Sequence, residues 1–131
     1  MIYEETVVLD QPFDQALTRV KEALAAEGFG TLTEIDMQAT LKQKIDKDID
    51  RYVIVGACNP QLASRALEAE PQIGVLLPCN VVVRQDDGDV IVEALDPHMM
   101  ATISGKDDIE PIATEARELI NNALTRLSSS P

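Results

Sequence analysis

Two short segments of the sequence each place a cysteine beside an asparagine and a proline. The first is Cys58-Asn59-Pro60 and the second is Pro78-Cys79-Asn80. A thiol can act as a nucleophile, a redox centre or a ligand for a soft metal ion, and its reactivity depends on how readily it ionises. These six residues are therefore the candidate binding site of the chain.

The two thiols are expected to differ in reactivity because their neighbours differ. Asn59 followed by Pro60 is typical of a helix start, where backbone N–H groups favour a thiolate on the adjacent Cys58. Cys79 lies among the apolar residues of the stretch 75–82, which favours its neutral thiol. We expect Cys58 to react faster and no disulfide to join the two in a reducing compartment. Packing of both thiols in the core is the simpler alternative, because unpaired cysteine is often buried.

A soft-metal site is a second use for these cysteines. His98, the sole histidine, is followed by Met99 and Met100. Thiolate and thioether ligands suit Cu(I) better than Mg²⁺ or Ca²⁺, so the three residues could join Cys58 and Cys79 around such an ion. The sequence leaves open whether the two cysteines are adjacent in space.

Three other patterns resemble known sites but lack an essential residue. The run 46–50 is spaced like a calcium loop, but Arg51 and Ala57 stand where that loop needs glycine and glutamate. Gly28-Phe29-Gly30 lacks the third glycine of a nucleotide-binding loop. His98 has no nucleophile elbow with which to form a hydrolase triad. A solvated loop, a helix stop and a surface histidine are the better interpretations.

Composition limits the classes of partner. Aromatic residues make up 3% of the chain and tryptophan is absent, so platforms for stacking bases or sugars are few. The formal net charge of -12 repels phosphate backbones and anionic membranes. We therefore expect neither nucleic acid nor membrane as a partner.

The sequence also predicts a cytoplasmic location. Residues 1–5 include two glutamates, where a secretion signal needs a basic segment. The longest apolar stretch, 73–83, is interrupted by Pro78 and is too short to span a bilayer.

Hydrophobic periodicity predicts the elements that must position the two cysteine segments. Strands are expected over 2–9, 31–35, 52–57, 75–84 and 89–95, with a hairpin turn at Asp87-Gly88 between the last two. Helices are expected after Pro12, after Asp36, after Asn59 and over 109–127, and the third of them should bury Leu67. The residues between 95 and 109 are expected to form a loop.

This order predicts the α+β class, with a single mixed or antiparallel sheet covered by helices. The 131 residues match the size of one domain, and neither a repeat nor a linker is present. We therefore expect residues 1–131 to form a single domain.

The order of the motifs resembles a known family. Gly28-Phe29-Gly30, Lys44, Cys58-Asn59-Pro60, the run 77–83 and Asp96-Pro97 are together similar to family 302 of the domains of unknown function, over nearly the whole chain. The resemblance implies a bacterial and archaeal α+β domain that is likened to the sheet-and-helix module of the TATA-binding protein. It also implies a site at the paired Cys-Asn turns, with no settled activity, substrate or cofactor.

These observations favour a non-enzymatic binding or interaction module whose partner is a second copy of the chain or a small molecule. A homodimer would use the apolar last helix and a first strand at the edge of the sheet. The alternative is a thiol-based redox or soft-metal-handling protein centred on Cys58 and Cys79, and a hydrolase or transferase comes third.

Overall fold

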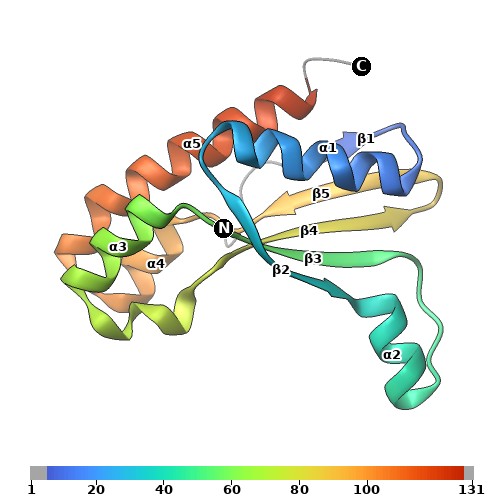
Figure 1. Cartoon of the computed structure of the whole chain (residues 1–131), viewed down its shortest axis with the longest axis horizontal. Coiled ribbons are helices and arrows are strands. Elements are labelled where there is room, and N and C mark those ends of the chain that lie inside the picture. The colour runs from blue at the N-terminus through green and yellow to red at the C-terminus, as the bar shows by residue number, and fades with distance from the viewer. Residues whose placement is uncertain (1–5, 129–131) are drawn as a thin grey trace.

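The computed structural model describes residues 6–128, whose strands form one antiparallel sheet of five (Figure 1). The strands are β1 (Val7–Leu9), β2 (Gly30–Asp36), β3 (Tyr52–Cys58), β4 (Cys79–Asp86) and β5 (Asp89–Ala94). Their spatial order is β1-β5-β4-β3-β2, and each neighbouring pair is antiparallel. The α+β class and the single sheet are thus confirmed, and the sheet is antiparallel. The likeness to the TATA-binding protein stays a prediction. Residues 2–5 of the first expected strand lie outside the described part of the chain.

Helices cover one face of this sheet and one of its ends (Figure 1). The α-helices are α1 (Phe13–Ala26), α2 (Met37–Ile45), α3 (Pro60–Ala69), α4 (His98–Ser104) and α5 (Glu110–Ser128). Two short 3₁₀ helices, η1 (Pro71–Leu76) and η2 (Asp107–Ile109), complete the described elements. None of these helices combines the length and the apolar character that crossing a membrane requires.

The main core lies between the sheet and the helices α1 and α5. Alternate residues of β1, β3, β4 and β5 point toward these helices and are buried, whereas their neighbours point away, and every residue of β2 is exposed. The core is almost entirely aliphatic, as the low aromatic content predicts, and it is built on these strand residues: Val7, Leu9, Val53, Val55, Ala57, Val81, Val83, Val90, Val92 and Ala94.

A second, smaller apolar cluster lies at the end of the sheet where β3 ends and β4 begins. It joins α3, η1, α4 and α5, and Leu119 packs against both clusters. Its buried members are Leu62, Ala66, Ile73, Cys79, Met100, Ile109, Ile112 and Ala116. This cluster lies against the two cysteine segments on the helix-covered side of the sheet.

Several element boundaries are set by local chemistry, as predicted. The backbone N–H of Ala39 donates to Asp36 Oδ1 at 2.9 Å and so caps α2. Asp87 and Gly88 both have positive φ, 52° and 94°, which the tight turn between β4 and β5 requires.

Three expectations about local structure were wrong. Residues 75–77 do not belong to a strand, because η1 occupies 71–76 and Val75 is 88% exposed. The strand starts only at Cys79, since Pro78 has no N–H to donate to a ladder. The expected loop after residue 95 contains α4, whose seven residues are too few to show a helical repeat. Leu67 is exposed, because the buried stripe of α3 runs through Leu62 and Ala66.

Candidate functional site

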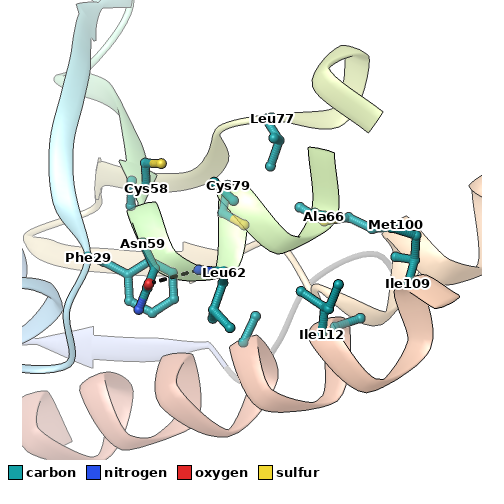
Figure 2. Close-up of a pocket in the computed structure, with 14 residues that line it drawn as sticks. Phe29, Cys58, Asn59, Leu62, Ala66, Leu77, Cys79, Met100, Ile109 and Ile112 are labelled. Atoms are coloured by element: carbon teal, nitrogen blue, oxygen red, sulfur yellow. Dashed lines mark hydrogen bonds between the residues drawn. The ribbon is translucent and has the colours of Figure 1, made fainter. Parts of the chain in front are cut away.

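The register of β3 and β4 brings the two cysteine segments together. The strands are antiparallel, and Ala57 lies opposite Cys79. The end of β3 and the start of β4 therefore share one end of the sheet, and Cys58 lies one residue beyond the partner of Cys79 (Figure 2). Gly30 of β2 pairs with Cys58, so the Gly28-Phe29-Gly30 turn lies at the same end of the sheet as the two cysteine segments. Lys44 lies on α2 at the opposite end of the sheet.

The two thiols point to opposite faces of the sheet. Cys79 shares its face with Ala57 and points toward the helices, so the next residue, Cys58, points the other way. In Figure 2 the Cys79 side chain points toward Leu62, whereas that of Cys58 points away from it. The two sulfurs are not bonded to each other. A disulfide requires Cβ vectors that converge, and this arrangement opposes one.

Burial determines the chemistry of Cys79. The residue is part of the second apolar cluster, and this burial, with a smaller effect from the charge of Cys58, raises the pKa of its thiol to about 11. Cys79 is therefore a neutral thiol at physiological pH, as its apolar neighbours predict. Cys58 is only half-buried.

Asn59 holds the start of α3 and the glycine turn together. The backbone N–H of Leu62 donates to Asn59 Oδ1 at 3.2 Å, which confirms the predicted cap, with Pro60 in the first turn of the helix. A Cβ added to Gly28 would stand 2.9 Å from Asn59 Nδ2, and the φ of Gly28 is 88°. The turn therefore needs glycine both for its backbone conformation and for its close approach to Asn59.

Pro78 covers the outward side of β3. A Cβ added to Gly56 would overlap Thr33 Oγ1 and would stand 2.9 Å from Pro78 Cγ. The peptide bond that precedes Pro78 is cis. Asn80 is exposed, and its carbonyl accepts a hydrogen bond from the backbone N–H of Leu95 at 3.0 Å. Thus Pro78 and Asn80 both face the side of the sheet that Cys58 faces.

A cavity of about 30 Å³ lies beneath the paired turns, and apolar side chains form nearly all of its wall. Ligand pockets usually measure roughly 300–1,000 Å³, so this cavity has room only for a particle the size of a water molecule. Its lining residues are Phe29, Ala57, Cys58, Asn59, Leu62, Ala63, Ala66, Leu77, Cys79, Met100, Ile109, Ile112, Ala113 and Ala116 (Figure 2). The cavity is therefore a packing defect beneath the turns and has no room for a substrate.

The candidate soft-metal ligands are only partly brought together. Met100 lines the same cavity as the two cysteines. His98 lines a different hollow, where its Nε2 lies 3.2 Å from Thr114 Oγ1, and Met99 is half-buried. Within residues 6–128, His, Cys, Asp and Glu side chains form no group of three or more that could hold a metal ion.

The outward face of the sheet was missed by the sequence interpretation. Helices α1 and α5 lie on the other face (Figure 1). We call the outward face the open face, and the pairing registers assign to it these residues: Val8, Gly30, Thr33, Ile35, Tyr52, Ile54, Gly56, Cys58, Asn80, Val82, Arg84, Asp86, Asp89, Ile91 and Glu93.

The open face is apolar at its centre. Ile54, Val82 and Ile91 occupy the middle strands and remain partly exposed, and Val8 at the edge is 57% exposed. Cys58 and Asn80 stand at one end of this face. The available signal in the sequence was that β3, β4 and β5 carry aliphatic residues at both alternating sets of positions, whereas a strand with one solvated face alternates with polar residues.

Comparison with known proteins agrees with this fold. The family described as domain of unknown function DUF302 matches residues 5–127. A solved structure, described as that of an uncharacterized conserved protein DUF302 from Bacillus stearothermophilus, is 28% identical to this chain with a TM-score of 0.89. The match covers 97% of this chain and 98% of that one. No curated protein matches the chain. The paired turns, the antiparallel sheet and the family match together establish that this chain belongs to the DUF302 family.

Proposed function

We propose that this chain is a non-enzymatic binding module whose contact surface is the open face, with the paired Cys-Asn turns at its end. The observation that carries the proposal is the partial exposure of Ile54, Val82 and Ile91 in the middle strands. Apolar side chains gathered on one side of a sheet are typical of an interaction surface. A face built from the outward side of a sheet has no deep pocket, so it suits a protein partner better than a small molecule.

The chemistry of the turns supports binding over catalysis. Cys79 is neutral, the cavity beneath the turns has no room for a substrate, and Asn59 Oδ1 already accepts the capping hydrogen bond of α3. The exposed Asn80 side chain lies at the end of the open face, where it can supply polar contacts at the rim of an interface.

Native mass spectrometry of the untagged protein tests this proposal. We expect the wild-type chain to carry a non-covalent protein companion, which Ile54→Glu loses because it places a charge at the centre of the open face. Val75→Glu is the matched control, since Val75 is exposed on η1 and does not belong to a strand of the sheet. A wild-type chain that carries no companion, or a companion that Ile54→Glu retains, contradicts the proposal.

A thiol-based function is the second candidate, and the half-buried position of Cys58 at the edge of the open face favours it. At neutral pH we expect native alkylation to modify Cys58 well before Cys79, which is buried and neutral. Because the thiolate is the reacting form, modification of Cys79 should rise with pH up to about 11.

Peptide mass analysis after timed alkylation of the reduced, native protein quantifies each cysteine. Denatured protein is the control, and there the two rates should converge. If both cysteines react only on unfolding, each is a packed core thiol and the thiol-based function is wrong.

A further inference from the structure

We infer that the partner at the open face is a basic amphipathic helix, whose apolar side lies along a stripe of aliphatic side chains and whose lysine or arginine residues meet the carboxylates beside that stripe. This inference rests on the proposed function and names the class of partner that the surface takes. Such a helix is recognised by the order of its apolar and cationic residues.

The aliphatic residues of the open face form one stripe across the whole sheet. Each strand contributes one of them, and in the spatial order of the strands they are Val8, Ile91, Val82, Ile54 and Ile35. Val8 pairs directly with Ile91, and Ile54 pairs with both Val82 and Ile35. Ile91 and Val82 are diagonal neighbours on β5 and β4, within reach of each other's side chains. The stripe ends at Val8 and Ile35, which are 57% and 44% exposed.

A helix suits this stripe better than a single extended segment does. The strands pair within the plane of the sheet, so its face offers side chains and no free backbone groups. An extended segment laid there would leave its own N–H and C=O groups unpaired, whereas a helix pairs them internally. Strands lie about 4.8 Å apart, so a stripe across five of them is about 19 Å long. A helix of that length has about 13 residues, with an apolar residue at every third or fourth position facing the sheet.

The charge of the open face determines the charge of the partner. Three carboxylates, those of Asp86, Asp89 and Glu93, share the face with the guanidinium of Arg84, so the face is net acidic. Arg84 Nε lies 2.8 Å from Glu93 Oε1 and its Nη1 lies 3.9 Å from Asp86 Oδ2, whereas Asp89 has no ion-pair partner in the described part of the chain. Asp89 precedes Ile91 by two residues, so it stands about 7 Å from the stripe along β5. A lysine or arginine on the docked helix would supply the opposite charge there.

The charge of the whole chain favours the same partner. A formal net charge of -12 repels a second copy and other acidic proteins, and it attracts a basic segment from a distance. On the other side of the stripe the open face carries the uncharged side chains of Thr33 and Asn80. The partner therefore needs its cations on the side that faces the hairpin between β4 and β5.

Fluorescence anisotropy with three labelled synthetic peptides of equal length tests the inference on the full chain. The first peptide has leucine along one side of a helix and lysine elsewhere, the second has the same composition without a helical stripe, and the third has glutamate in place of lysine. We expect the first peptide to bind at least roughly tenfold more tightly than the second, and the third to show no saturable binding. Binding of the first peptide should weaken as the salt concentration rises.

Two substitutions with matched controls separate the apolar stripe from the charges. Ile54→Asn should raise the dissociation constant of the first peptide roughly tenfold, whereas Ile103→Asn, at an exposed isoleucine of α4, should leave it unchanged. Asp89→Lys should raise it roughly fivefold at low salt. Glu118→Lys changes the net charge equally but lies exposed on α5, on the other face of the sheet, so its effect should be much smaller (Figure 1). Asp89 is exposed, so its variant tests the face even if Ile54→Asn does not fold.

The outcomes separate this inference from the proposed function. Equal binding of the first two peptides, or equal effects of Asp89→Lys and Glu118→Lys, would show attraction by overall charge alone and would overturn the basic helix. If no peptide binds but Ile54→Glu still loses the companion in native mass spectrometry, the open face remains the contact surface and its partner is of another class. Peptide binding that Ile54→Asn leaves unchanged overturns both, because the contact then lies elsewhere.

Discussion

Replacing Ile109 with alanine is expected to lower the free energy of unfolding by about 2–5 kcal/mol, the usual range for truncating a buried isoleucine. Ile109 is 1% exposed, belongs to the second apolar cluster and lines the cavity of about 30 Å³ beneath the paired turns. Because a void already exists there, the space left by the lost carbons would add to it. The neighbouring helices are also held by other contacts, which limits their collapse into that space.

Urea titration at neutral pH measures this loss. Ile103→Ala is the matched control, because Ile103 has the same chemistry but is 62% exposed, and its change should stay within about 0.5 kcal/mol. Cys79 lines the same cavity as Ile109, so its native alkylation should also become faster in Ile109→Ala. Equal stability of the two variants would mean that the second cluster contributes little to folding.

Replacing Gly56 with alanine is expected to destabilise the fold by about 1–3 kcal/mol, as overpacking does in well-filled sites. The new methyl group would overlap Thr33 Oγ1 and press on Pro78 Cγ, so either β2 or the segment that contains Pro78 must move. The loss should therefore be accompanied by faster modification of Cys58, which stands two residues further along β3.

Gly30→Ala provides the comparison for this substitution in the same sheet. No atom lies within 4 Å of a Cβ at Gly30, so the change should be neutral or stabilise the fold by a few tenths of a kcal/mol. Adding Thr33→Ala to Gly56→Ala removes the hydroxyl that the new methyl group overlaps and should restore part of the stability. Thermal melts of the three variants and the wild-type chain settle the point: equal losses at Gly56 and Gly30 would show that the space above Gly56 is not filled.

The sequence predicts best where a boundary depends on a few adjacent residues. Asn59 and Asp36 start helices because their side chains accept hydrogen bonds from N–H groups of the first turn, and Asp87-Gly88 forms a turn because both residues accept positive φ. Short elements are harder to predict. The seven residues of α4 show less than two turns of periodicity, and the run 75–77 has strand-like composition although Pro78 keeps it out of the ladder.

The candidate site depended on information that no local pattern contains. Whether Cys58 and Cys79 are neighbours depends on the direction in which β3 and β4 pair, and residues 59–78 between them are compatible with either direction. The open face was missed for a related reason. Ile54 and Val82 are aliphatic residues of the kind found in a strand that is buried on both sides, and only the placement of α1 and α5 on one side shows that they lie on the open face.

The opposed directions of the two thiols give the chain a pair of built-in reporters. A fluorophore or spin label on Cys58 would sit at the rim of the open face and would respond to association, whereas Cys79 becomes available only when the second apolar cluster opens. Because the two side chains point to opposite faces of the sheet, one labelling time course on the unmodified chain records assembly and internal opening as separate signals.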